Sequence, residues 1–220
     1  MNTNEFEIAE WRKRMRFMAD LIFASAMTIM ILNLEFPDIK YISDPALLTK
    51  FMLKQLGGMG AFFISFVTVA VYWMKHLEHF GVTLKIDQTF IWYQLMYLAF
   101  IMLVPFWSTY VGEAPDNIAF KLFMSINLVM IGAFSYLSMN YAANPNHRLI
   151  HNGVSDEEIS IAKRQILTEP AIAVLAAAVA FVNPVYWDFA FILIPVLFMI
   201  RKKLVKVDYF KLLRKKPKEN

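Results

Sequence analysis

Long runs of apolar residues, separated by short polar segments, make up most of this chain. A helix needs about 20 mostly apolar residues to cross roughly 30 Å of hydrocarbon, and the first four runs reach that length. Two shorter runs follow, and the Asn183-Pro184 dipeptide between them predicts a tight hairpin of two helices. The pattern therefore predicts an all-α membrane protein with six transmembrane helices per chain, over residues 17–35, 54–75, 89–110, 118–141, 166–182 and 185–202.

The composition favours the same class of protein. Of the 220 residues, 58% are hydrophobic and 18% are charged, whereas ordinary globular chains have about 45–50% and 25%. We expect the six helices to form one transmembrane domain over residues 1–204, followed by a basic tail over residues 205–220. The tail is expected to lie against the anionic lipid headgroups of the bilayer.

The basic residues predict how the chain is oriented. Six spans place both termini on one side, and 18 of the 22 Lys and Arg residues fall on that side. The other four are Lys40, Lys50, Lys54 and Lys121, of which the last lies near enough to a helix start to snorkel. Because cytoplasmic segments carry the excess of Lys and Arg, we expect a multi-pass protein of the cell (inner) membrane with cytoplasmic N- and C-termini.

The sequence contains few groups suited to catalysis or metal binding. It has no cysteine, which excludes disulfides and cysteine-ligated metals, and only 7 glycines, none in a G-x-S-x-G or G-x-x-x-x-G-K motif. His147 and His151 have the i, i+4 spacing of a zinc motif but lack its neighbouring glutamate. A filter motif of the T-V-G-Y-G type is also missing. We therefore expect no enzyme activity, no metal site, no cofactor and no nucleic-acid partner.

The first predicted helix carries small and polar side chains that are unusual in a helix facing lipid. Asp20 lies one turn into it, where a carboxylate either pairs with Arg16 at i−4 or marks a functional site. A stripe of mixed polarity follows one face, because its members are spaced by 4, 3 and 4 residues: Leu21, Ser25, Thr28 and Leu32. Such a stripe either packs against another helix or lines a narrow pore where several copies meet on an axis.

Polar residues also occur at the cytoplasmic ends of the second and third predicted helices. His76 follows the second helix, and Gln94 lies two turns beyond Asp87, which opens the third. The positions of His76, Gln94 and Asp20 are compatible with one polar cluster at a common depth in the membrane.

Residues 14–20 resemble the R-x-x-x-F-S-D signature of the transmembrane protein 175 family, with Arg14 and Asp20 at its charged positions. Members of this family are potassium channels, lysosomal in animals, and the chain resembles the smaller prokaryotic members. The resemblance covers roughly the first half of the chain. Beyond the signature it rests on Phe23-Ala24, Thr28, Leu32, Glu35-Phe36-Pro37, Trp73, His76, Asp87, Pro105-Phe106, Thr109 and Gly112.

The chain departs from the family pattern at functional positions. Two residues of the signature differ, and Gln94 stands where the family commonly has Asn. The family's hydrophobic constriction, usually an Ile five residues after the signature's Asp, falls on Ser25. We therefore expect Leu21, Ile29 or Leu32 to form the narrowest apolar ring.

The resemblance implies a potassium-preferring cation channel without a T-V-G-Y-G filter, which passes K⁺ and other monovalent cations through side-chain rings and closes at a hydrophobic constriction. A single repeat per chain implies a homotetramer in which the first helix of each copy lines a central pore. The implied pore-lining residues are Leu21, Ser25, Thr28, Ile29 and Leu32. A structural network that ties three helices together is expected from Arg14, Asp20, His76 and Gln94. A secondary transporter or a non-conducting membrane scaffold is the alternative.

Overall fold

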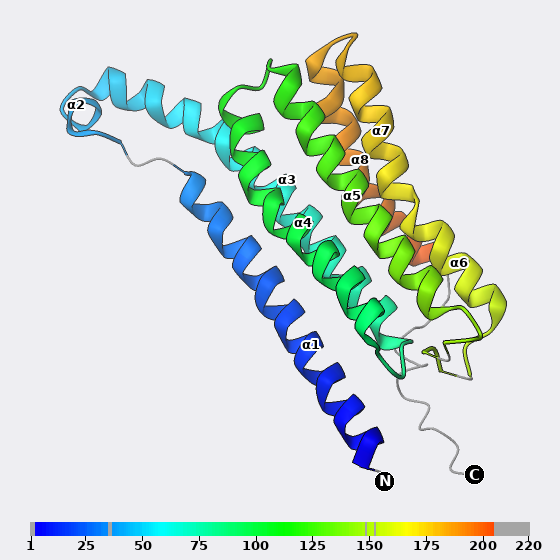
Figure 1. Cartoon of the computed structure of the whole chain (residues 1–220). Helices are drawn as coiled ribbons and strands as arrows, with labels where there is room; N and C mark the ends of the chain where they lie inside the picture. Colours follow the sequence, from blue (N-terminus) through cyan, green and yellow to red (C-terminus); the bar gives the residue numbers. More distant parts are fainter. Residues whose placement is uncertain (1–2, 35–36, 148, 152, 205–220) are drawn as a thin grey trace.

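The computed structural model describes residues 3–34, 37–147, 149–151 and 153–204, which form helices joined by short connections (Figure 1). In chain order the helices are α1 (Thr3–Ile29), the 3₁₀ helix η1 (Met30–Asn33), α2 (Ile39–Ile42), α3 (Pro45–Gly81), α4 (Gln88–Glu113), α5 (Ile118–Ala142), α6 (Asp156–Ile166), α7 (Thr168–Ala180) and α8 (Pro184–Leu204). The described residues contain no strand, only an isolated bridge between Thr83 and Ile150. The all-α fold class is confirmed.

Four helices, α1, α3, α4 and α5, are long and apolar enough to cross a membrane. The 13 residues of α7 span only about 20 Å. However, Leu167 alone separates α7 from α6, and the two helices run along α5 one after the other (Figure 1). A short turn at 181–183 connects α7 to α8, which has 21 residues. That this C-terminal pair crosses the membrane, and that the chain has six spans, stays a prediction.

Side-chain caps explain where the three long inner helices begin. Asp44 precedes α3 and accepts a hydrogen bond from the backbone of Ala46, while Pro45 occupies the first helical position. Asp87 and Asn117 cap α4 and α5 in the same way. Each cap satisfies backbone N–H groups that the helix itself leaves unpaired, so short polar connections suffice between long helices.

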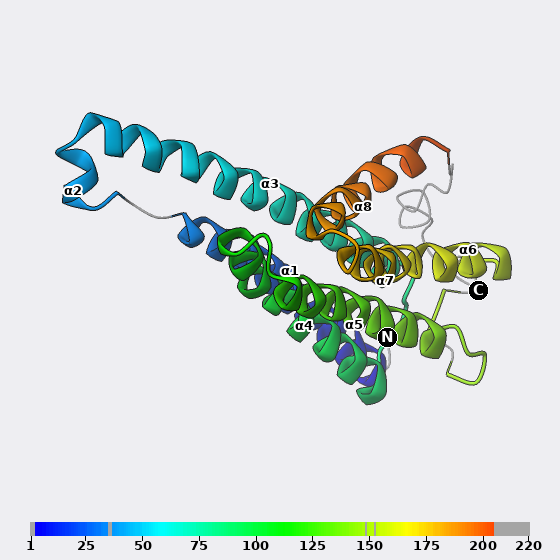
Figure 2. The ribbon, with the colours of Figure 1, turned by 90° about the horizontal axis from the view of Figure 1, so that it is seen from above.

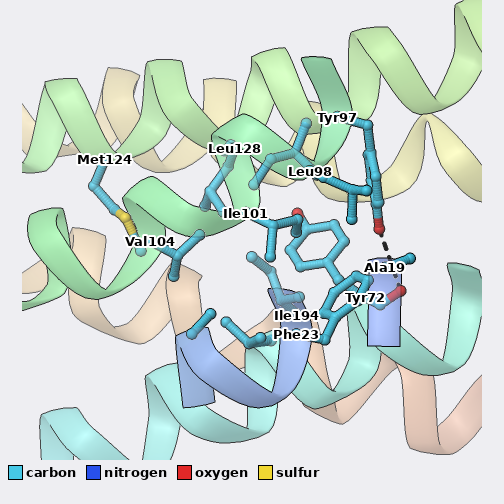
Figure 3. Packing of buried hydrophobic residues seen from close by; sticks show 14 of the residues in the cluster. Ala19, Phe23, Tyr72, Tyr97, Leu98, Ile101, Val104, Met124, Leu128 and Ile194 are labelled. Carbon is cyan, nitrogen blue, oxygen red and sulfur yellow. Dashed lines mark hydrogen bonds between the residues drawn. The ribbon is translucent and has the colours of Figure 1, made fainter. Parts of the chain in front are cut away.

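The core lies where α1 packs on α3 and α4. Ala19 and Phe23 of α1 face Tyr72 of α3 and the α4 residues Tyr97 and Leu98, and all five are buried (Figure 3). The Tyr97 hydroxyl donates to the Tyr72 carbonyl oxygen at 3.3 Å. Further along the chain α4 packs on α5, α5 on α7, and α7 on α8.

The N-terminal part of α3 extends beyond the rest of the bundle. Figures 1 and 2 show α2 and the first turns of α3 at a distance from α5, α6, α7 and α8. Leu53 and Leu56, on this part of α3, are exposed in the single chain. This end of α3 therefore presents apolar surface to lipid or to another chain.

Gly132 lets α5 approach α7 closely, and we expect Gly132→Ala to lower the stability of the protein. A Cβ atom at this position would lie 1.9 Å from Cγ of Pro170, so α7 would have to move. Overpacking of this kind typically costs about 1–3 kcal/mol. The matched control is Gly60→Ala in α3, whose Cβ would meet nothing within 4 Å and which gains about 1 kcal/mol of helix propensity.

Thermal unfolding of the purified protein in detergent distinguishes the two variants. Gly132→Ala should unfold at a lower temperature than the wild type and Gly60→Ala at the same or a higher one. Equal unfolding temperatures for the two variants would contradict the close α5–α7 contact.

Candidate functional site

Helix α1 has two faces, and the residues predicted to line a pore occupy the free one. The buried face consists of Met15, Ala19, Phe23, Ala26 and Met30, which pack on α3 and α4. The residues predicted to line the pore are all exposed in the single chain: Leu21, Ser25, Thr28, Ile29 and Leu32. The structure therefore brings these five residues together on a surface that no other part of the described chain covers.

Hydroxyl groups lie in the middle of this free face. The Thr28 hydroxyl donates to the Ala24 carbonyl oxygen at 2.8 Å, so its proton is used within the helix. The Thr28 oxygen keeps its role as an acceptor, which is what a partly dehydrated cation requires. Ser25 lies one turn earlier, and apolar side chains lie before and after the two hydroxyls.

The free face changes helix type near its end. The α-helix stops at Ile29, and Met30–Asn33 continue as a 3₁₀ helix. A 3₁₀ helix advances by a larger angle per residue than an α-helix, so Leu32 is turned away from strict α-helical register with Leu21. Leu32 is 77% exposed, more than Leu21 or Ile29.

Three of the four predicted network residues, Asp20, His76 and Gln94, lie where α1, α3 and α4 pack together, but they do not form a single hydrogen-bonded chain. Asp20 accepts a hydrogen bond from the Trp73 indole N–H at 2.9 Å, which ties α1 to α3. Gln94 donates instead to Ser138 of α5, at 2.6 Å. Arg14 is exposed and takes part in no hydrogen bond or ion pair among the described residues. Its role in a network stays a prediction.

Arg12, two residues before Arg14, makes a contact between α1 and α3. Its guanidinium group donates to the Phe80 carbonyl oxygen at 3.4 Å and lies 5.6 Å from the centroid of the Phe80 ring. Arg12 and Arg14 both belong to the same basic run, and only the packed register of α1 distinguishes them.

His76 is buried among aromatic rings. Its ring centroid lies 5.7 Å from those of Phe23 and Tyr97 and 5.4 Å from that of Phe80. Its Nε2 atom and the Gln94 Oε1 atom are buried and have no hydrogen-bond partner among the described residues. Both residues line one cavity of about 10 Å³, which is close to the space that one water molecule needs. His76 and Gln94 thus line the same small cavity, while Asp20 bonds to Trp73.

Two buried lysines were not singled out from the sequence as site residues. Lys75 of α3 forms an ion pair with Glu169 of α7, and both side chains are buried. Lys121 of α5 does not snorkel to the interface as expected: it is fully buried and donates to the Asp188 carboxylate of α8 at 2.9 Å. These pairs tie the α7–α8 hairpin to the rest of the bundle at its two ends. A lysine inside the apolar run 118–141 was the available signal for Lys121, whereas nothing in the sequence pointed to its partner.

Candidate metal ligands are not grouped in the described part of the chain, where no three His, Cys, Asp or Glu residues are arranged to hold a metal ion. His147 and His151 lie in the connection after α5, so their i, i+4 spacing is not helical. The Nδ1 atom of His147 is 2.8 Å from the Tyr141 carbonyl oxygen. Burial, and secondarily the charge of Arg12, lower the pKa of His151 from its ordinary value of 6.5, which favours the neutral ring.

We expect Asp20→Ala to destabilise the protein rather than to change its ion preference. The change leaves the Trp73 indole N–H without its charged acceptor, which costs about 1.5–3 kcal/mol. Asp20→Asn is the matched control, since an amide oxygen still accepts a hydrogen bond. Thermal unfolding should show a clear loss for Asp20→Ala and a smaller one for Asp20→Asn. A stably folded Asp20→Ala protein with altered cation preference would show that Asp20 acts on the ions instead.

Comparison with known proteins relates this arrangement to a family. Residues 14–105 match the family described as endosomal/lysosomal potassium channel TMEM175. This segment contains all the residues predicted for the pore and for the network, from Arg14 to Gln94.

Three curated proteins are similar in sequence, and each is named a potassium channel. The protein from Chamaesiphon minutus is 24% identical over 77% of this chain and 84% of its own length. Those from a Chryseobacterium species and from Streptomyces collinus are 27% and 25% identical, over 46% and 56% of this chain and 49% and 61% of their own lengths.

A solved structure has the same fold. The crystal structure of a lysosomal potassium-selective channel TMEM175 homolog from Chamaesiphon minutus aligns with a TM-score of 0.75, at 20% identity. The alignment covers 87% of this chain and 98% of that one. The similarity therefore extends beyond the matched segment to α5 and to the C-terminal helices.

Proposed function

Since this chain is a prokaryotic-type member of the TMEM175 family, we propose that it is a potassium-preferring cation channel of the membrane. The observation that carries the proposal is the free face of α1, which lies within the segment matched to the family. The names of the three similar curated proteins support potassium as the permeant ion.

We place the pore along α1, at the axis of a homotetramer. Ser25 and Thr28 are exposed hydroxyl residues on a helix that otherwise qualifies as a membrane span. If these hydroxyl groups faced lipid, they would find no polar partner there. Four copies of α1 around an axis would instead present rings of hydroxyl oxygens to passing cations. Such a pore selects ions through side chains and needs no T-V-G-Y-G filter.

The same face supplies the hydrophobic constriction. Apolar residues follow the hydroxyls on the free face, and Leu32 is more exposed than Ile29. A narrow ring of such side chains closes a pore by dewetting. We assign the constriction to Leu32 in preference to Leu21 or Ile29.

The proposed channel is a multi-pass protein of the inner membrane with both termini in the cytoplasm. Its proposed partners are the lipid bilayer and identical copies of the chain, and it needs no cofactor besides the permeant K⁺. A secondary transporter is less favoured because α4 continues as a helix through Pro105, although broken helices near the membrane midplane are typical of transporters. A non-conducting scaffold is the remaining alternative.

Reconstitution into liposomes tests the function. The purified protein should pass K⁺ faster than Na⁺ down a gradient, and mass measurement should give four chains per assembly. Flux that depends on a coupled second ion would indicate a transporter. Liposomes that pass no cation under any voltage would indicate a scaffold.

Cysteine substitution tests the position of the pore, since the chain has no native cysteine. Thiol reagents of the methanethiosulfonate type should block current through Thr28→Cys and Ser25→Cys channels. The matched control is Ile126→Cys, an exposed position on α5 that we place away from the axis. Block at Ile126→Cys but not at the α1 positions would move the pore to another helix.

A further inference from the structure

A second site lies away from α1, in a cavity of about 330 Å³ between α3, α4, α5 and α8. Its walls are mainly apolar and include Ile64, Val111, Met124, Trp187 and Phe191. This volume lies at the lower end of the range for cavities that bind small molecules or cofactors. Neither the free face of α1 nor the network residues contribute to it, so the site is separate from the proposed pore.

Two of the residues around this cavity are glycines. Gly60 of α3 and Gly112 of α4 both line it. A Cβ atom built on Gly60 would meet nothing within 4 Å, so the space beside this residue is open. At both positions the cavity wall is formed without a side chain.

The polar side chains around the cavity are largely occupied within the chain. Ser65 and Ser108 bond to each other, with their oxygen atoms 2.6 Å apart. The Trp187 indole N–H donates to Ser125 at 2.8 Å. Asp188 accepts from the buried Lys121, which neutralises its charge. The walls thus offer little hydrogen bonding to a polar ligand, and the site suits an apolar occupant.

The position of the cavity indicates where an apolar occupant would come from. Ser108 lies five residues before the end of α4, roughly 8 Å along the helix axis, and Met124 lies in the second turn of α5. The cavity is therefore in the half of the bundle where α4 ends and α5 and α8 begin. Three of the surrounding helices, α3, α4 and α5, qualify as membrane spans, so the leaflet on that side surrounds it with lipid tails.

We propose that this cavity binds one acyl chain of a membrane lipid, which enters beside Gly60 and lies against Trp187. The inference needs insertion of the chain into a bilayer but not ion conduction, so it survives if the proposed channel function fails. An acyl chain fills an apolar space without leaving polar groups unpaired. It would also stabilise the contact of α8 with α3 from within.

Fluorescence quenching by brominated lipid tests this proposal. Trp187 is 3% exposed, so lipids that merely surround the protein reach its ring poorly, whereas a chain inside the cavity would contact it. The protein is reconstituted into vesicles of phosphatidylcholine with or without bromine on its acyl chains. The difference between the wild type and Trp187→Phe isolates the signal of Trp187 from that of the other four tryptophans.

We expect brominated acyl chains to quench about half or more of the Trp187 fluorescence, because a pocket of this kind encloses most of its ligand and holds it in contact with the ring. Gly60→Leu, which fills the cavity, should relieve this quenching. Gly58→Leu on the same helix, outside the cavity lining, is the matched control and should leave it unchanged. Unfolding temperatures near that of the wild type establish that both leucine variants are folded.

Three results would overturn the proposal. Quenching by aqueous acrylamide but not by brominated chains would mean that water fills the cavity. Quenching by neither reagent would mean that protein from a second copy fills it. Quenching by brominated chains that Gly60→Leu does not relieve would mean that the chain contacts Trp187 from outside the cavity.

Discussion

Replacing Asp188 by alanine is expected to lower the free energy of unfolding by about 3–5 kcal/mol, because the change strands a buried charge. Lys121 is fully buried, and its Nζ donates to the Asp188 carboxylate at 2.9 Å and to the Pro184 carbonyl oxygen at 2.6 Å. The ammonium group also lies 5.5 Å from the centroid of the Trp187 ring. Without Asp188, no negative charge would remain in contact with it among the described residues.

Replacing the other partner, Lys121, is expected to lower the free energy of unfolding by less. This asymmetry makes the prediction specific. The Asp188 side chain is 43% exposed, so Lys121→Met leaves a carboxylate that water can still reach. We expect a loss of about 1–2 kcal/mol for Lys121→Met. The double variant Lys121→Met with Asp188→Ala should lie within about 1 kcal/mol of the wild type, since apolar replacement of a whole buried pair is often neutral.

Equilibrium unfolding in detergent, carried out on all four proteins as a double-mutant cycle, measures these differences. Equal losses for the two single variants would contradict the one-sided burial of the pair. A double variant as unstable as Asp188→Ala would show that Lys121 contributes mainly through its packing and its bond to Pro184.

Much of the fold followed from hydropathy, because the bilayer imposes a length on apolar helices. The helices α4 (Gln88–Glu113) and α5 (Ile118–Ala142) lie close to the ranges predicted for them. Helix α3 begins at Pro45 and so extends nine residues before its predicted span, since the cap at Asp44 rather than the apolar run determines its start. Hydropathy indicates which part of a helix contacts lipid, whereas the capping residue indicates where the helix begins.

The free face of α1 was also predictable, because helical periodicity alone places Leu21, Ser25 and Thr28 on one side. The partners of polar groups were not. Asp20 bonds to Trp73 and Gln94 to Ser138, and both bonds join residues more than forty positions apart. Such pairings depend on how helices are rotated about their axes, and a single sequence without its packing carries little information about that rotation.

The C-terminal helices show the same limit for buried charges. The Lys75–Glu169 pair joins α3 to α7, although each residue lies near a helix end and would be expected from the sequence to reach water. Packing of α7 against α5 encloses Glu169 and leaves Lys75 as its counter-charge. Burial of an ionisable group is thus a property of the assembled bundle, and the sequence did not predict it even for Lys121, which was expected to snorkel to the interface.

The position of the proposed constriction leads to a large expected change in conduction. Leu32→Ala should raise the basal current of the reconstituted protein by about tenfold or more. The change removes three carbons from each of four copies, and each buried methylene contributes about 0.8 kcal/mol to the stability of the closed ring. A tenfold increase in the open fraction needs a loss of only about 1.4 kcal/mol. Ser25→Ala should change the current little, because a hydroxyl ring holds water and does not close the pore by dewetting.

Control variants separate a gate from a general loss of packing. Leu175→Ala removes the same atoms from an exposed position on α7 and should leave the current unchanged. Leu21→Ala tests the other end of the free face. We expect a smaller effect there, because Lys13 and Arg16 and their neighbours would repel one another if four copies of α1 crowded together at that end. A larger current from Leu21→Ala than from Leu32→Ala would place the constriction toward the N-terminal end of α1. A larger current from Ser25→Ala would place it at Ser25.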